Sequence, residues 1–487
     1  MLVEGICQRL PKRFLGGVMP HLLIKKLPPL MLLGVALLLG GCATGSIFTS
    51  YPKQIQPIKL QLESKQYTQA QAALDGRQDD ADKILYLMEK GRVAQLAGDT
   101  DASIEDFKRV IEAFEENDEK AKVSASDTAA QGAALLTSDN AIPYAGEGYE
   151  RVFVHQFQAM NYLMSRNLEA AMVEVRRANQ EQQYELERFE DEVADAEEDA
   201  REQMEKNDGF MDSFASLQAA AGQVKNSFQN AYTFYVSGIL FEATGKPNDA
   251  YIDYKKALEI FPDNAYVQRD VLRLAQTLGM REDYERFNKE FGNDYPPPKA
   301  SEGEIVLLFE HGFAPVKTNV DVNLIINNGV RSIAFPTYVE QWQAPSLLNV
   351  SISGGAVIGE TSPIVSVQAL AAKALLERLP GMMVRQILRL VAKNETSEQG
   401  GKLLGDWGKL AVNVLNVVTE QADRRSWLTL PQDAQILRSS LPEGQYQLQL
   451  QNGTAVGAMD IKVVPGKKTL IRVVATGNTF HTASVVL

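Results

Sequence analysis

Apolar and polar residues in the first half of the chain alternate with a helical period, and the helices recur at a fixed spacing. The clearest unit covers 231–264, where small residues stand at the eighth, twentieth and twenty-seventh positions: Gly238, Ala250 and Ala257. Small residues there let two antiparallel helices approach closely, and Pro262 ends the second helix. We therefore expect a pair of antiparallel helices in this unit.

The same spacing recurs more loosely from two other starts, Ile84 and Val152, which lie two periods apart. Gly91 and Ala159 stand at their eighth positions. The pattern resembles the tetratricopeptide repeat, which implies helix pairs that bury their apolar faces on one another. The sequence therefore predicts a tetratricopeptide-like α-solenoid over 55–294.

An acidic stretch at 178–208 interrupts the repeats, with 13 acidic residues against three basic ones. Its helical spacing predicts one long polar helix. This helix is either a solvated extension of a repeat helix or an arm that contacts a partner.

Beyond the solenoid the pattern changes to short alternating runs that are typical of strands. The prolines at 296–298 predict a stiff linker over 295–303. The expected strands are 305–309, 320–326, 446–450, 460–464, 470–475 and 484–487. We expect a small β-sandwich over 304–487 with a helical insertion at 366–422. The predicted fold is thus multidomain, an α-solenoid followed by a β-sandwich.

The helical insertion carries a basic stripe opposite an apolar one. Arg385, Arg389 and Lys393 follow one another at a spacing of four residues. Such a stripe is either a solvated face or a surface that meets a negative partner. That partner would be the acidic helix or phosphorylated lipid at a membrane surface.

The N-terminus has the features of an export signal. Lys25 and Lys26 precede an apolar stretch at 30–39, which is about half as long as a membrane-spanning helix. The stretch ends in Leu39-Gly40-Gly41-Cys42-Ala43, which resembles the lipobox of bacterial lipoproteins. The alternative is an ordinary signal peptide with a chance cysteine.

The lipobox resemblance implies a specific processing of the chain. Residues 1–41 would be removed as a signal peptide, Cys42 would carry diacylglycerol and an amide-linked acyl chain such as palmitate, and 42–54 would form an anchor linker. Because Ala43 stands where an Asp would retain the protein at the inner membrane, the resemblance implies sorting to the outer membrane. We expect the body of the protein in the periplasm.

Composition and motifs limit the chemistry. The 487 residues include 45% hydrophobic residues and carry a net charge of −13, which argues against nucleic-acid binding. Both cysteines, Cys7 and Cys42, lie near the N-terminus, so neither a disulfide scaffold nor a cysteine zinc site is expected. The chain has no HExxH, CxxC, GxSxG or P-loop motif. We therefore expect no enzyme, no metal and no cofactor beyond the covalent lipid.

Several stretches resemble a poorly characterised family of bacterial outer-membrane lipoproteins with tetratricopeptide-like repeats. They are Thr137 to Arg151, Glu174 to Asn179, Phe309-Glu310-His311-Gly312, Phe335-Pro336-Thr337-Tyr338 and Ala422 to Trp427. Members are often encoded near lipoproteins that regulate peptidoglycan synthases. The resemblance implies partners among envelope proteins of peptidoglycan or surface-polymer assembly, and it implies no reaction.

A cluster of aromatic and charged residues around the repeat that starts near Val152 is the candidate partner-binding site. Arg151, His155 and Tyr162 share one helix face by their spacing. The full set is Tyr144, Glu147, Arg151, His155, Tyr162, Glu174, Arg176 and Arg177. The cluster either binds a peptide or a carboxylate in a helical groove or forms an internal ion-pair network.

Three functions remain open. The first is a non-catalytic, lipid-anchored scaffold that binds envelope proteins through a helical-repeat groove. The second is a glycan- or polymer-binding lipoprotein in which the sandwich is the recognition domain. The third is an envelope hydrolase with two dispersed carboxylates.

Overall fold

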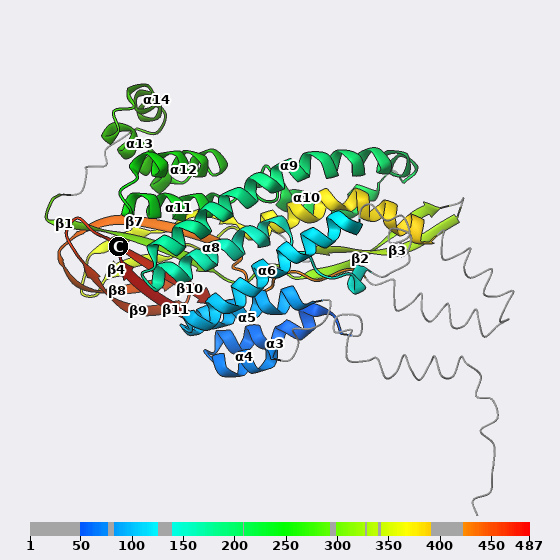
Figure 1. Ribbon diagram of the computed structural model, residues 1–487, viewed down its shortest axis with the longest axis horizontal. Coiled ribbons are helices and arrows are strands. Elements are labelled where there is room, and N and C mark those ends of the chain that lie inside the picture. The colour runs from blue at the N-terminus through cyan, green and yellow to red at the C-terminus, as the bar shows by residue number, and fades with distance from the viewer. Residues whose placement is uncertain are drawn as a thin grey trace, which may run out of the picture. The chain divides into compact units, whose positions relative to one another are not determined.

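The computed structural model (Figure 1) describes residues 49–75, 82–124, 139–207, 209–292, 299–326, 329–338, 342–390 and 422–487. Helices form the N-terminal part, and strands predominate from Glu302 onward. The predicted order of an α part followed by a β part is therefore confirmed. The predicted lipobox with Cys42, and Lys393 of the insertion, lie outside the described residues.

The helices of the N-terminal part are arranged in pairs. The pairs are α3 (Tyr51–Glu63) with α4 (Tyr67–Leu74), α5 (Lys83–Ala97) with α6 (Thr100–Ser124), α8 (Gly148–Met164) with α9 (Leu168–Lys206), α11 (Ala231–Ala243) with α12 (Pro247–Ile260), and α13 (Ala265–Thr277) with α14 (Arg281–Phe291). Between pairs, α4 contacts α5, α6 contacts α8, α9 contacts α11 and α12 contacts α13. This stacking is that of an α-solenoid, and the helix pair expected over 231–264 is confirmed.

Small residues allow the two helices of a pair to touch. A Cβ atom at Gly91 of α5 would lie 2.9 Å from the ring of Phe107 on α6, and one at Gly238 of α11 would collide with the ring of Tyr254 on α12. The side chain of Asn230 accepts hydrogen bonds from two backbone N–H groups at the start of α11. Asn264 does the same for α13, one repeat later.

The acidic stretch continues a repeat helix. Helix α9 runs without a break from Leu168 to Lys206, so its N-terminal half is the second helix of a pair. Two short elements follow, η2 (Phe210–Phe214) and α10 (Ala215–Ala221), and a 3₁₀ turn, η1 (Asp139–Ala141), precedes α8. The stretch at 178–208 thus continues a repeat helix as far as Lys206, which fits both a solvated extension and an arm that contacts a partner.

The described strands form two larger sheets and a hairpin. Sheet A has the order β11 (Thr479–Val486), β10 (Lys468–Thr476), β1 (Glu302–His311), β7 (Asp433–Pro442) and β6 (Ser362–Ser366). Sheet C has the order β5 (Val357–Glu360), β4 (Asn349–Ile352), β8 (Gly444–Asn452) and β9 (Ala455–Val463). The hairpin pairs β2 (Lys317–Ile326) with β3 (Gly329–Tyr338). Strands β1 and β10 are parallel, and the other pairs are antiparallel.

Strand β1 is buried on both of its faces. Ile305, Leu307 and Phe309 belong to a core that sheet A shares with sheet C. Val306 and Leu308 belong to a second core that includes the helices of the solenoid. Sheet A is therefore the middle layer between sheet C and the solenoid. Residues 367–390, which follow β6, are helical.

Candidate functional site

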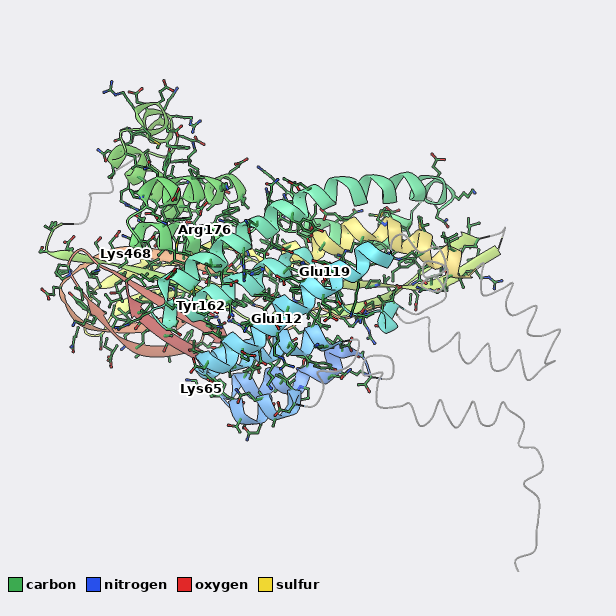
Figure 2. All side chains as sticks on the ribbon, viewed as in Figure 1. Lys65, Glu112, Glu119, Tyr162, Arg176 and Lys468 are labelled. Atoms are coloured by element: carbon green, nitrogen blue, oxygen red, sulfur yellow. The ribbon has the colours of Figure 1, made fainter. Side chains whose placement is uncertain are left out.

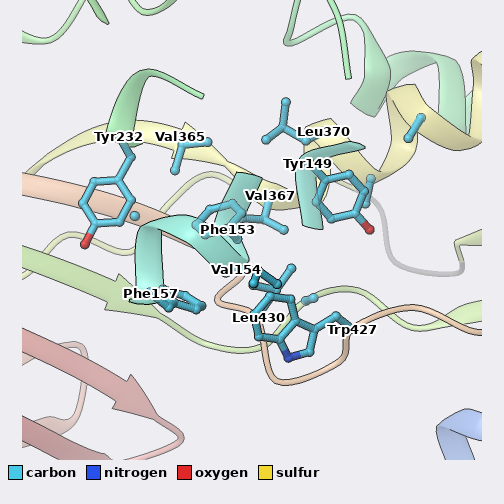
Figure 3. Packing of buried hydrophobic residues seen from close by; sticks show 14 of the residues in the cluster. Tyr149, Phe153, Val154, Phe157, Tyr232, Val365, Val367, Leu370, Trp427 and Leu430 are labelled. Atoms are coloured by element: carbon cyan, nitrogen blue, oxygen red, sulfur yellow. The ribbon is translucent and has the colours of Figure 1, made fainter. Parts of the chain in front are cut away.

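Sheet A and the chain leading into β7 cover the inner surface of the solenoid, formed by α5, α8 and α11. Most side chains of these helices are buried. Trp427, fully buried before β7, contacts the rings of Phe107 and Phe157 edge to face, with centroids 5.9 and 5.7 Å away. Figure 3 shows Trp427 beside Phe157. The inner surface of the solenoid is therefore filled by the protein's own C-terminal half, so the helical-repeat groove in which we expected a partner does not lie there.

Glu310 of β1 is the centre of an ion cluster at this contact. Its fully buried carboxylate accepts hydrogen bonds from Arg92 of α5 at 2.5 Å and from Arg472 of β10 at 2.9 Å. Tyr232 of α11 donates to it at 3.2 Å. Burial raises the pKa of Glu310, but the two guanidinium groups outweigh burial and lower that pKa to about 2. The charged carboxylate thus joins two helices to the sheet.

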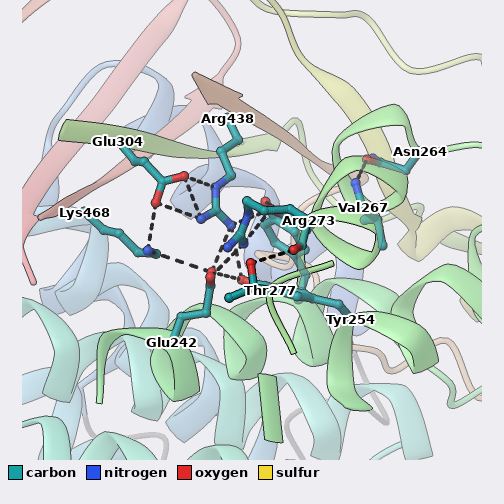
Figure 4. Close-up of polar contacts among 11 residues, drawn as sticks. Glu242, Tyr254, Asn264, Val267, Arg273, Thr277, Glu304, Arg438 and Lys468 are labelled. Atoms are coloured by element: carbon teal, nitrogen blue, oxygen red, sulfur yellow. Dashed lines mark hydrogen bonds and ion pairs between the residues drawn. The ribbon is translucent and has the colours of Figure 1, made fainter. Parts of the chain in front are cut away.

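A second ion cluster lies between sheet A and the later helices (Figure 4). Arg438 of β7 donates to both carboxylate oxygens of Glu304, at 2.8 and 2.9 Å, and pairs with Asp270 of α13 at 2.8 Å. Glu242 of α11 lies 3.1 Å from the same guanidinium, and Lys468 donates to Glu304 at 2.8 Å. Burial raises the pKa of Glu304, but the opposing cations lower it to about 2.

Neither ion cluster follows from the repeat pattern, although the sequence carries a signal for both. Glu304 and Glu310 interrupt an apolar strand and point to the same side of it, because they are an even number of residues apart. Arg438 and Arg472 interrupt two further buried strands. Charges inside apolar strand runs indicate a buried ionic contact, because an unpaired buried charge is too costly to keep.

Two buried carboxylates bind the backbone around Trp427. Glu150 of α8 accepts the N–H group of Trp427 at 2.7 Å. Glu89 of α5 accepts the N–H groups of Leu428 and Thr429 at 2.9 and 3.1 Å. Burial raises the pKa of Glu89 to about 7, although these hydrogen bonds oppose the rise. The solenoid therefore holds this segment by its main chain as well as by the indole ring.

Three members of the candidate partner-binding set are used inside the protein. The Tyr144 hydroxyl donates to a buried carboxylate of α8 at 2.6 Å. Glu147 caps α8 and pairs with Arg378 at 2.8 Å. Arg151 pairs with Asp118 of α6 at 2.6 Å. These side chains fix the segment before α8 and do not line an open groove.

The other members of the set are divided between interior and surface. The Nδ1 atom of His155 lies 2.8 Å from Glu174, which also pairs with Arg177 at 3.0 Å. His155 and Glu174 are buried, whereas Arg177 is exposed. Tyr162, which is partly exposed, and Arg176, which is exposed, are labelled in Figure 2. The buried members match the internal ion-pair network that the sequence left open. Only the exposed ones are available to a partner.

The predicted basic face is not a continuous solvent-facing stripe. Arg389 is only 4% exposed and pairs with Asp139 of η1 at 2.7 Å. Arg385 is exposed, and Lys393 lies outside the described residues. The expectation is therefore corrected for Arg389, because the helix at 367–390 turns this side chain toward the segment before α8. Among the described contacts, its negative partner is Asp139 of that segment.

Two of the stretches that carry the family resemblance, Thr137 to Arg151 and Ala422 to Trp427, meet at the segment before α8. Arg425 lies over the ring of Tyr144, with 5.4 Å between its guanidinium carbon and the ring centroid. It also donates to the backbone carbonyls of Asp139 and Ile142 and pairs with Asp82 at 3.0 Å. Residues that carry the family resemblance therefore join the C-terminal half to the solenoid.

The described histidines take part in separate pairs. The Nδ1 atom of His311 lies 3.2 Å from Asp433. The hydroxyl of Tyr67 lies 2.6 Å from Nδ1 of His481, and burial lowers the pKa of His481 to about 4. Among the residues that the structure describes, no group of three or more His, Cys, Asp or Glu side chains is arranged to hold a metal ion.

An open groove lies between α12 and α14, the second helices of their pairs. Its volume is about 760 Å³. Its apolar lining consists of Tyr251, Ile252, Leu258, Pro262, Met280, Phe287 and Phe291, and its charged lining of Lys255, Lys256, Glu259, Asp283, Arg286 and Glu290. The rings of Phe287 and Phe291 stack 5.8 Å apart, and Ile252 is 52% exposed. This groove, unlike the inner surface, is accessible to another molecule.

Comparisons with known proteins add little to this geometry. No protein-family model and no curated protein matches the chain. Similar solved structures include "Crystal structure of MamA" (TM-score 0.26, 12% identity, 47% of this chain and 90% of that chain) and BtubC (BKLC) from P. vanneervenii (TM-score 0.29, 13% identity, 55% of this chain and 90% of that chain). These TM-scores are too low to assign a shared fold. Within the described ranges, every helix is too short or too polar to cross a membrane.

Proposed function

We propose that this protein is a non-catalytic, lipid-anchored scaffold of the bacterial envelope that binds partner proteins in the groove between α12 and α14. The observation that carries the proposal is the contrast between two surfaces. The inner surface of the solenoid is filled by sheet A, whereas the groove is open and has a volume of about 760 Å³. Stacked helix pairs commonly present such extended surfaces to partners.

The occupant that fits this groove is an amphipathic helix of the partner. Helices α12 and α14 have 14 and 11 residues, so the trough between them is roughly 16 to 21 Å long. Ile252, which is exposed, and Phe291, which is partly exposed and stacks on the buried Phe287, offer apolar contacts for one face of a docked helix. Charges of both signs along the lining offer ion pairs to its polar side.

Cys42 supplies the proposed attachment to the outer membrane, with the body of the protein in the periplasm. The support is the lipobox-like sequence that ends at this residue. Two or more acyl chains hold a protein stably, whereas one chain gives only marginal binding. The proposed partners are therefore envelope proteins, in peptidoglycan or surface-polymer assembly.

Site-specific crosslinking in intact cells tests the docking groove. A photoreactive amino acid replaces Ile252 in one variant and Leu60 of α3 in the control; both side chains are 52% exposed. We expect position 252 to crosslink one partner, at a segment whose apolar residues recur every three or four positions. Equal adducts from both positions, or none from 252, would refute the docking site.

Mass spectrometry tests the anchor separately. The N-terminal peptide of the mature protein should begin at Cys42 and carry the added mass of the acyl chains. Substitution of Cys42 by Ala should release the protein from the membrane fraction. An unmodified cysteine, or unchanged membrane association of the variant, would contradict the anchor and leave the docking groove untouched.

A further inference from the structure

The outer face of sheet C carries a row of four glutamines on β8, one of its two inner strands. Residues Gln445, Gln447, Gln449 and Gln451 alternate along β8 and are all exposed. Between them Leu448 and Leu450 are fully buried against sheet A. The buried leucines fix the register of the strand, since a slip of one residue would expose them. The row is therefore a fixed feature of the surface, about 20 Å long.

The register identifies what stands beside each amide. Gln449 lies between Ser351 of β4 and Ala458 of β9, and both neighbours have short side chains. Directly opposite residues in a sheet are only about 5 Å apart, so short neighbours leave the amide open to solvent. In the same register, Gln451 lies between Asn349 of β4 and Val456 of β9.

Most of this hydrogen-bonding capacity is unused by the protein. Gln447 donates weakly to Asp460 at 3.3 Å. Within the described part of the chain, the side chains of Gln445, Gln449 and Gln451 make no hydrogen bond to protein. Each amide offers two donors and one acceptor with two lone pairs. The row thus presents repeated, uncharged donors and acceptors along one line.

We infer that this glutamine row binds a neutral glycan, a polymer rich in hydroxyl and acetamido groups. A carboxamide pairs with neighbouring hydroxyls as donor and acceptor at once, and with an acetamido group as one amide pairs with another. An added peptide strand is excluded at β8, because β4 and β9 already pair with its backbone on both sides. Glu360 and Asp460 flank the row and outnumber the cation Lys462, which stands opposite Gln445, so the surroundings disfavour an anionic polymer.

Titration of the purified protein with defined oligosaccharides tests this site. The probes are the hexamer of N-acetylglucosamine, cellohexaose and, as the anionic comparison, heparin. We expect a neutral probe to bind, and the double variant Gln449→Ala and Gln451→Ala to bind it roughly tenfold more weakly. The control variant Gln183→Ala and Gln276→Ala, which changes two exposed helical glutamines, should bind like the unaltered protein.

Three outcomes would overturn the inference. They are no binding of either neutral probe at about 1 mM, binding of heparin alone, and equal weakening in both double variants. Because all four substituted side chains are exposed, each variant should unfold at an unchanged temperature, which separates lost binding from lost folding. A variant with Ile252→Glu should bind the glycan normally, so this site is tested independently of the docking groove.

Discussion

The substitution Glu310→Gln gives the sharpest test of how the solenoid holds the sheet. It removes a negative charge that pairs with both Arg92 and Arg472, all three being buried. The pKa of Glu310 is lowered from 4.5 to about 2, which corresponds to about 3 kcal/mol of stability at neutral pH. Removal of one partner of a buried ion pair costs about 3 to 5 kcal/mol in other proteins, which agrees with this value.

The pH dependence of this loss has a definite sign. Because the folded pKa lies below the unfolded one, Glu310 contributes its stability above about pH 4.5 and loses it as the pH falls toward about 2. Urea unfolding followed by tryptophan fluorescence measures the free energy of unfolding for both proteins. The difference between them should therefore be about 3 kcal/mol at neutral pH and should shrink on acidification.

Glu302→Gln is the matched control for this experiment. Glu302 starts the same strand, but its side chain is 19% exposed and lies 3.8 Å from the exposed Lys299. Surface pairs of this kind contribute at most about 1 kcal/mol. If Glu310→Gln costs no more than Glu302→Gln, or if its cost does not change with pH, the ion cluster does not hold the sheet on the solenoid.

Three further predictions follow from the same interface and from the repeats. Trp427→Ala should lower the free energy of unfolding by about 3 to 5 kcal/mol, since the fully buried indole would leave a cavity; an unchanged urea midpoint would contradict the packing. Gly238→Ala should cost about 1 to 3 kcal/mol in thermal unfolding, because the new methyl group meets Tyr254; a rise in melting temperature would show that the helices can separate freely. The pKa of Glu89 is raised to about 7. The free energy of unfolding of the unaltered protein, relative to that of Glu89→Gln, should therefore fall as the pH rises from about 4.5 to about 7. If this difference in free energy increases with pH instead, the reasoning is wrong.

The repeats could be predicted because their signal is local. Gly238 and Tyr254 stand sixteen positions apart, as do Gly91 and Phe107, and such pairs are visible in the sequence. The strand pattern was equally clear where polar and apolar residues alternate, as in β8. It was not clear in β7, which carries Arg438 and several other polar residues although most of it is buried. Tertiary ion pairs, which no local pattern reveals, make that strand compatible with the interior.

The candidate partner-binding set shows what the sequence pattern could not predict. The spacing of Arg151 and His155 correctly places them on one face of α8, but spacing does not reveal what covers that face. Their partners Asp118 and Glu174 belong to two different helices. The filling of the inner surface depends on Trp427 and Glu310, which are hundreds of residues away from α5 in the chain. Whether the chain itself covers the inner surface of its repeats can therefore be seen only in the folded structure.

Contacts between the two ends of the described chain have a consequence for biogenesis. Tyr67 of α4 binds His481 of β11 across 414 residues of sequence, and the hydroxyl of Thr479 donates to the carbonyl of Glu63. A ribosome completes the solenoid long before it makes β10 and β11. Contacts of such long range are slow to form, and apolar surface that awaits them is prone to aggregate. Until residues 468–486 are available, the inner surface of the solenoid therefore lacks part of the sheet that covers it.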